Sequence, residues 1–434
     1  MSVSSNSRPT ATRRFLATKV TALVARSGRL NSLTPSRVGL RPQDAPYSPT
    51  GAHFRAANQR LRKIRTGIER RRILLERNWR RSSPQHALVY MAMLEREVDR
   101  ARRTFGLFFE IFSQRGSDFA PALAAHDVIA ADCYQAIRDA DPFVLDRPLL
   151  KPVCYMEHGA SPSTNRRGVQ LNRLMGEANP FPVIRIPWDR DNPWQPVFLH
   201  EVAHNLQADL GVWNENRDAV ARRLAGISNP LATTVYRRWH KEIFADLAAL
   251  LLGGPSAAWG MLEFLAHPGA RALTYRPGGA HPTGYFRGLL LAEMLRRMGF
   301  AQEAARVQKV WTGLYNPQRG HRLPGHLLGS SGTIVPAVVD EIAYQPRRNL
   351  GQRALADILP FTRDQEAAIR RGGMLLARGR VPQLPPRHMV SASRCALQMG
   401  GDPQRVSDLV IHHLAGLAAA QRMQPLIGRQ RAAA

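Results

Sequence analysis

Apolar residues recur at helical spacing over residues 195–211, and this stretch organises the rest of the chain. Its apolar side chains fall three or four positions apart, at Val197, Phe198, Val202, Ala203, Leu206 and Leu210. That spacing is typical of an α-helix with one buried face. Pro196 suits the first helical turn, and Gly211 suits the position just past the helix end. The pattern therefore predicts one helix over 195–211.

The same periodicity predicts helices along most of the chain. Residues 52–113 are expected to form a helical hairpin that breaks at Ser82-Ser83-Pro84, and 118–140 to form a further helix. The next strong helix is expected over Leu231–Leu252, closed by Gly253-Gly254-Pro255. Shorter helical patterns occur at 256–266, 285–299, 301–313, 350–378 and 402–422. Residues 317–335, which are rich in Gly, His and Pro, are expected to be a loop.

Two short runs, 152–156 and 182–186, carry the apolar and β-branched residues of strands. The residues between them, 159–168, are polar and predict a loop. Prolines bracket the second run, which predicts a strand at the edge of the sheet. Such an edge, just before the 195–211 helix, could accept a bound peptide as an extra strand; a covered edge is the alternative.

These elements predict a mostly α fold with a small β-sheet, in the α+β class. We expect four regions: a basic disordered tail over 1–50, a helical region over 51–148, a central domain over 149–345 and a C-terminal helical region over 346–434. The tail has no acidic residue before Asp44 and is rich in Ser, Arg, Thr and Pro. At most a short helix is expected within it, near Phe15–Val24.

The charge and the cysteine content of the chain bear on its binding partners and its cellular compartment. The 434 residues carry a net charge of +28, and residues 1–120 contain 24 Lys and Arg against 8 Asp and Glu. This basic N-terminal region is a candidate binding surface for nucleic acid, an acidic partner or an anionic membrane; a solvated face of an Arg-rich protein is the alternative. No apolar run reaches the ~18 residues of a transmembrane segment. Three scattered cysteines without a C-x-x-C pair favour a reducing compartment, and we expect a cytoplasmic protein.

Within the 195–211 helix lies His200-Glu201-Val202-Ala203-His204, an H-E-x-x-H string. Residues four apart lie on one face of a helix, one turn from each other. His200 and His204 therefore have the spacing of two ligands to one metal ion. Glu201 lies beside them, where it can take a proton from a metal-bound water.

A catalytic zinc ion takes three protein ligands and leaves one position for water. Glu242 and Asp246 are the best candidates for completing the site, because they lie four apart on the otherwise apolar helix over 231–252. Carboxylates on so apolar a helix are costly unless they are paired or bind a metal. The alternative is an ordinary solvated edge paired with Arg237 and Arg238.

The order H-E-x-x-H followed by E-x-x-x-D on a second helix resembles the gluzincin class of zinc metallopeptidases. That resemblance implies a zincin-like catalytic domain over 149–345, with added N- and C-terminal helices. It implies that His200, His204 and Glu242 bind Zn²⁺ and that Glu201 is the general base. Asp246 would hydrogen-bond the far nitrogen of a ligand histidine, His200 by preference. The long gap between His204 and Glu242 implies an inserted loop over 213–230.

His281-Pro-Thr-Gly-Tyr-Phe-Arg287 fits an H-P-x-x-x-x-R pattern. It resembles a segment of the CAAX-prenyl and heat-shock membrane endopeptidases of that class, where the His and Arg help hold substrate and the active-site helices. By this resemblance His281 and Arg287 line the cleft, and we add Tyr285 as a candidate oxyanion donor. Those relatives have transmembrane helices and this chain has none, so prenylated or membrane substrates are not carried over.

The sequence thus predicts a soluble zinc-dependent peptidase that hydrolyses peptides or proteins. Zinc would lower the pKa of a bound water to about 7, and Glu201 would take its proton. One alternative is a metalloprotease associated with DNA through the basic N-terminal region. Another is a non-catalytic interaction or regulatory protein that keeps the zincin fold and binds through the hairpin at 52–113; the intact Glu201 argues against it.

Overall fold

A computed structural model of the chain describes residues 10–30, 32–145, 149–159, 162–171, 178–317 and 323–423. The chain divides into two compact units, the first comprising residues 1–117 and 168–180, and the second comprising 118–167 and 181–434. Most of the described residues are helical and one small sheet is present, which confirms the mostly α, α+β class. The helix over 118–140, expected in the N-terminal region, belongs to the second unit.

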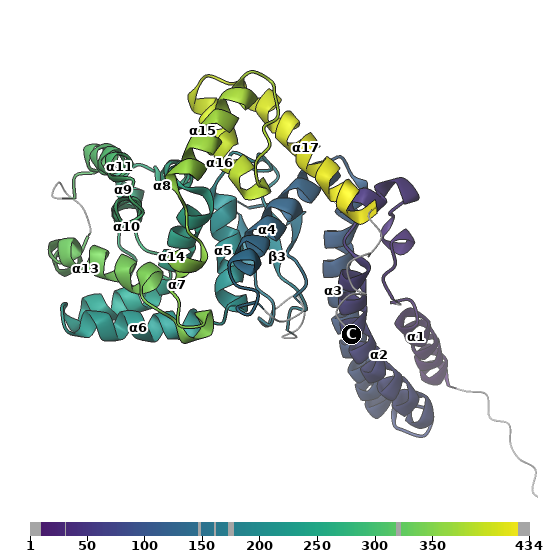
Figure 1. The fold of residues 1–434 in the computed structure, drawn as a ribbon. Coiled ribbons are helices and arrows are strands. Elements are labelled where there is room, and N and C mark those ends of the chain that lie inside the picture. The colour runs from purple at the N-terminus through teal and green to yellow at the C-terminus, as the bar shows by residue number, and fades with distance from the viewer. Residues whose placement is uncertain are drawn as a thin grey trace, which may run out of the picture. The chain divides into compact units, whose positions relative to one another are not determined.

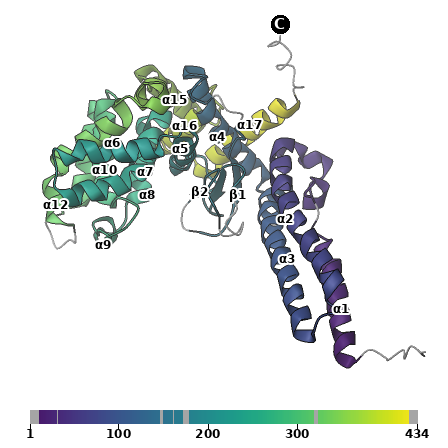
Figure 2. The same ribbon diagram turned by 90° about the horizontal axis from the view of Figure 1, so that it is seen from below.

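The first unit is built on a long helical hairpin, as the sequence predicts. Its helices α2 (Gly51–Asn78) and α3 (Pro84–Ser113) lie side by side (Figures 1 and 2). Ser83 ends the turn between them, because its side chain accepts a hydrogen bond from the His86 backbone N–H. Many arginines of α2 are exposed, including Arg62, Arg65 and Arg70. The nucleic-acid or acidic partner expected for this region stays a prediction.

The predicted disordered tail is wrong for the described residues between 10 and 50. Helix α1 (Ala11–Ser27) begins after Thr10, whose side chain accepts from the Arg13 backbone N–H, and it packs against α3. Its stripe of Leu16, Val20 and Leu23 is buried. This tertiary burial stabilises a helix whose Ser, Thr and Arg content by itself predicts disorder. Helix α1 contains the short helical segment, 15–24, that the sequence analysis allowed for.

The first unit also contains three 3₁₀ turns: η1 (Ser36–Val38), η2 (Pro42–Tyr47) and η3 (Gln114–Gly116). Residues 1–9 and 31 lie outside the described residues.

The second unit contains a three-stranded sheet in the order β1-β3-β2. Strands β1 (Val153–Met156) and β3 (Val183–Ile186) are parallel, and β2 (Ser163–Asn165) runs antiparallel on the other side of β3. The predictions of an edge strand at 182–186 and of a loop throughout 159–168 are therefore wrong. The prolines that suggested an edge flank β3 without interrupting it, so they remove no donor between Val183 and Ile186. Strands β1 and β2 form the two edges of this sheet.

The rest of the second unit is mostly helical (Figure 1). Most of its helices fall where apolar periodicity predicts them. The predicted ones are α4 (Ala120–Ala140), α5 (Val197–Asp209), α7 (Pro230–Gly253), α8 (Pro255–Leu265), α10 (Gly284–Arg297), α11 (Ala301–Leu314), α15 (Arg363–Ala377) and α17 (Pro403–Met423). The short helix α9 (Gly269–Ala272) was not predicted.

Other helices of the second unit correct the sequence reading. Helix α6 (Trp213–Ala225) replaces the inserted loop expected at 213–230, because Val220 and Leu224 bury a face that the surrounding charge obscured. Helices α12 (Gly325–Gly329) and α13 (Ser331–Val339) occupy much of the predicted loop 317–335, of which 318–322 lie outside the described residues. The helical stretch expected over 350–378 is divided between α14 (Leu355–Ile358) and α15. Helix α16 (Pro386–Gln398) lies within 379–401, where no helix was predicted. The π-helix η5 (Asp340–Tyr344) and the 3₁₀ turn η6 (Arg348–Leu350) precede α14.

Helix α7 is the central element of the second unit. Nearly every residue from Trp239 to Gly253 is buried, and α7 packs against α5, α6, α8 and α10. The Asn229 side chain begins the helix by accepting from the Ala232 backbone N–H at 2.8 Å. Burial on all sides holds its few polar residues at fixed positions. Among the described residues, no helix combines the length and apolar character that crossing a membrane requires.

Candidate metal centre

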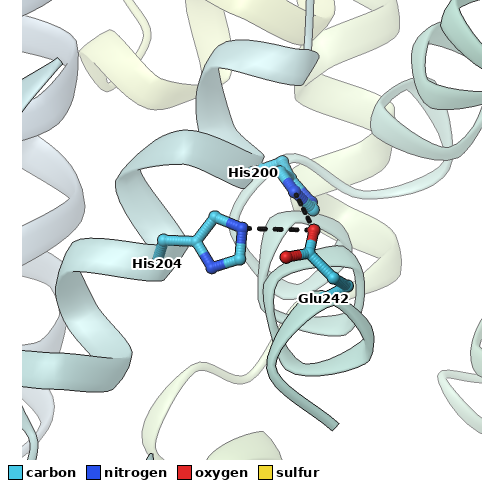
Figure 3. Close-up of side chains that lie close together, drawn as sticks. All are labelled: His200, His204 and Glu242. Atoms are coloured by element: carbon cyan, nitrogen blue, oxygen red, sulfur yellow. Dashed lines mark ion pairs between the residues drawn. The ribbon is translucent and has the colours of Figure 1, made fainter. Parts of the chain in front are cut away.

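Two packed helices bring the predicted ligands together. Helix α5 presents His200 and His204 from one face, and α7 presents Glu242 toward both imidazoles (Figure 3). The two histidine ring centroids are 4.6 Å apart, with the ring planes at 83°. The three residues form a group whose ligand atoms all lie within 4.8 Å of one another. The third ligand expected from the sequence is therefore within reach of the other two.

The spacing of the donor atoms fits a shared metal ion better than direct hydrogen bonds. The Nε2 atoms of His200 and His204 each lie 3.5 Å from Glu242 Oε2. Two donor atoms that are each about 2.1 Å from one ion, at tetrahedral angles, are roughly 3.4 Å apart. A good N–H···O hydrogen bond is shorter, about 2.9 Å. The two distances to Glu242 therefore suit a metal ion that the three residues could share.

His200 contacts the buried carboxylate of Asp246, which in turn contacts Arg287. Its Nδ1 atom lies 2.8 Å from Asp246 Oδ1. The two groups are in contact at this distance, but the orientation of the ring does not give a hydrogen bond from Nδ1. Asp246 in turn accepts two hydrogen bonds from Arg287, from Nε at 2.8 Å and from a terminal nitrogen at 2.6 Å. The predicted role of Asp246, a hydrogen bond that fixes the tautomer of His200, stays a prediction, although the carboxylate lies beside the ring.

The electrostatics of this group favour positive charge at its centre. Burial lowers the pKa of His200, but the Asp246 carboxylate outweighs burial and raises that pKa to about 9. Burial raises the pKa of Glu242, but the neighbouring imidazoles of His200 and His204 outweigh burial and hold that pKa well below its usual range. The Arg287 guanidinium and His200 likewise overcome burial and lower the pKa of Asp246. Two buried carboxylates thus stabilise a cation beside the imidazoles.

Glu201 lies in the same cavity as the ligands. Its side chain is largely buried, and it lines a cavity of about 480 Å³ together with His200, His204 and Glu242. The Glu201 backbone carbonyl accepts a hydrogen bond from Thr164 Oγ1 at 2.9 Å, which ties strand β2 to helix α5. Glu201 thus shares a cavity with the three predicted ligands, and its role as a general base stays a prediction.

The H-P-x-x-x-x-R segment is divided between the cavity and the protein interior. His281 lines the cavity, with its Nε2 atom 3.5 Å from Glu242 Oε2 and 68% of its side chain exposed. Arg287 reaches the cavity wall, but it is only 5% exposed and is held by Asp246. It thus joins α10 to α7 through Asp246. Tyr285 is not among the described residues that line this cavity, so its role as an oxyanion donor stays a prediction.

Several of the described cavity residues were not predicted from the sequence, among them Arg166, Trp213 and Lys241. Arg166 comes directly after β2 in the stretch that we expected to be a loop, and Trp213 begins α6 in the other expected loop. Lys241 is adjacent to Glu242 in sequence, and this adjacency is the sequence feature that could have placed Lys241 near the predicted ligands. The remaining lining residues include Ser163, Thr164, Val197 and Phe264.

Replacing Arg287 with Met is expected to lower the free energy of unfolding by about 3–5 kcal/mol, because it leaves the buried Asp246 carboxylate without its cationic partner. Chemical denaturation of both proteins measures the difference. Arg296→Met, on the same helix, is the matched control, because Arg296 pairs with Glu293 at the surface and its loss should change little. Equal stability of the Arg287 variant and the parent would show that Asp246 does not depend on this pair.

Comparison with known proteins provides no relative for this chain. No protein-family model matches it, and neither a curated protein nor a solved structure is similar to it at a significant level. Any function assigned to the chain therefore has to be supported by its own described side chains.

Proposed function

We propose that this protein is a zinc-dependent peptidase of the gluzincin type. The observation that carries the proposal is the gathering of His200, His204 and Glu242 into one group, in which both imidazole Nε2 atoms lie 3.5 Å from the Glu242 carboxylate. Glu201 beside that group and Asp246 behind His200 add the two further groups that metal-assisted hydrolysis requires. A non-catalytic metal site would have no need of a carboxylate at position 201.

The donor set supports zinc as the metal. Two imidazoles and one carboxylate are the ligands of many catalytic zinc sites, and the set leaves a fourth position open. Thiolate ligation is not available here, because the three cysteines, Cys133, Cys154 and Cys395, are buried elsewhere and free. Free buried cysteines also support our proposal of a cytoplasmic location.

A zinc ion in this site supplies Lewis acidity and makes water a nucleophile near neutral pH. Glu201 takes the proton of the attacking water and passes it to the leaving amine. His281 stands at the solvent side of the cavity, where its imidazole can donate to the carbonyl oxygen as negative charge develops. Asp246 and Arg287 hold His200 in the orientation that the reaction needs.

Removal and replacement of the metal test this proposal. Purified protein should contain about one zinc ion per chain, cleave an unstructured protein such as casein, lose activity with a chelator and regain it on addition of Zn²⁺. Mg²⁺, which prefers six oxygen ligands, should not restore activity. The metal content is measured by mass spectrometry and cleavage by the release of new amino termini. Full activity after complete metal removal would contradict the proposal.

A further inference from the structure

A group of cationic and aromatic side chains stands beside the metal ligands, and the proposed hydrolysis does not use it. Arg166 lies over the ring of Trp213, with its guanidinium carbon 4.0 Å from the ring centroid. Lys241 Nζ lies 5.8 Å from the same centroid. The three residues come from the end of β2, the start of α6 and the middle of α7, and all line the metal cavity. We call them the Trp213 cluster.

The charges that line the cavity indicate which kind of substrate group would bind beside the Trp213 cluster. Arg287 is neutralised by Asp246, with which it forms two hydrogen bonds. Among the described residues that line the cavity, Glu201 and Glu242 then stand against Arg166 and Lys241, two carboxylates against two cationic side chains. A bound divalent cation makes the total charge of this described set positive. The loaded cavity therefore favours an anionic group of the substrate.

The Trp213 cluster has the features of a carboxylate site. An arginine stacked on an indole ring has fewer orientations to lose, and its planar fork matches the two oxygens of a carboxylate. Burial lowers the pKa of Arg166 and the Glu242 carboxylate raises it, which shows that carboxylates near this guanidinium stabilise its charge. Lys241 adds a second positive charge near the same ring.

The position of Lys241 sets how far this carboxylate lies from the reacting bond. Lys241 Nζ is 3.8 Å from Oε1 of Glu242, the proposed zinc ligand. Neighbouring residues of a peptide have Cα atoms about 3.8 Å apart. A carboxylate held by Lys241 and Arg166 therefore belongs to a residue next to, or one removed from, the peptide bond at the metal.

We propose that Arg166, Trp213 and Lys241 form a subsite that binds a substrate carboxylate close to the bond being cleaved. This inference rests on the proposed peptidase function. The carboxylate has two sources, an Asp or Glu side chain or the C-terminus of the peptide. The first makes the protein selective for acidic sequences, and the second makes it a carboxypeptidase.

Matched peptides separate the two sources. One pair differs only by Glu or Gln beside the cleaved bond and has an amidated C-terminus; the other pair is uncharged and differs only by a free or amidated C-terminus. We expect one acidic member to be cleaved with a kcat/KM at least about tenfold above its neutral partner, mainly through KM. Arg166→Gln and Lys241→Met should each remove most of that preference. Arg223→Gln, an exposed residue of α6, is the matched control and should retain it.

Binding provides a readout that does not depend on hydrolysis. Zinc-loaded Glu201→Gln protein is titrated with the same peptides by calorimetry, with and without Arg166→Gln or Lys241→Met. Tighter binding of an acidic peptide that falls about tenfold in either variant supports the subsite, even if no peptide is cleaved and the peptidase proposal fails. Hydrolysis without any preference for a carboxylate overturns the subsite alone. A preference that persists in both variants also overturns it, since the carboxylate then binds the metal itself.

Charge reversal gives a further check that a misfolded variant cannot imitate. Arg166→Glu should shift the preference toward peptides with Lys beside the cleaved bond, while its zinc content stays at the parent value. Retention of the acidic preference in this variant contradicts a role for Arg166.

Discussion

Replacing Glu201 with Gln is expected to reduce peptide hydrolysis by roughly 10²–10⁴-fold while the protein keeps its metal. The amide has the shape of the carboxylate but cannot take a proton from water. Glu201 is not one of the three residues that converge on the metal position, so its replacement leaves the donor set intact. Turnover of a peptide and zinc content, measured on the same preparation, check both halves of the expectation.

A matched control separates this effect from the loss of a charge anywhere on the chain. Glu76→Gln removes a carboxylate from the exposed face of α2, where it pairs with Arg72 at the surface. Its activity should equal that of the parent. If Glu201→Gln cleaves peptides as fast as Glu76→Gln, another group must be the base.

Replacing Glu242 with Ala is expected to empty the metal site. Two imidazoles remain, and the cavity loses the carboxylate that both of them face at 3.5 Å. Changes to residues that only orient a ligand typically weaken metal binding about 10–100-fold, and loss of a ligand should exceed that. Zinc content after dialysis against a weak chelator is the measurement, and the variant should retain little zinc under conditions in which the parent stays loaded.

His281→Ala is the informative comparison for this experiment. His281 Nε2 lies at the same 3.5 Å from Glu242 Oε2 as the two ligand histidines do, but its side chain is mostly exposed. We expect the His281 variant to keep its zinc and to lose activity only. If His281→Ala loses zinc and Glu242→Ala keeps it, the ligand set is misassigned.

Local chemistry explains why the ligands could be predicted. The spacing of His200 and His204 fixes their common face as soon as the stretch is helical, and apolar periodicity indicates that it is. Glu242 and Asp246 were conspicuous because carboxylates on an apolar helix need a partner. In the structure, Asp246 pairs with His200 and Arg287, and Glu242 faces both ligand imidazoles.

Other parts of the site had no such local signal. Strand β2 is three polar residues long, and only its pairing with β3 makes it a strand. Trp213 begins a helix whose sequence is rich in charge, and its buried face becomes visible only when α7 packs against it. Helix α1 likewise depends on burial against α3, because its composition alone resembles a disordered tail.

The sequence by itself determined the helical class of this protein, the pair of histidines, the neighbouring glutamate and the second helix that carries the third donor. These depend on residues within one or two helical turns of each other, where the chain's local geometry is enough. The tertiary structure alone decided that Glu242 meets the histidines, that β2 rather than β3 lies at the sheet edge, and that Arg166, Trp213 and Lys241 share one cavity. Each of these depends on contacts between distant segments, which packing of the whole core fixes and no local pattern encodes.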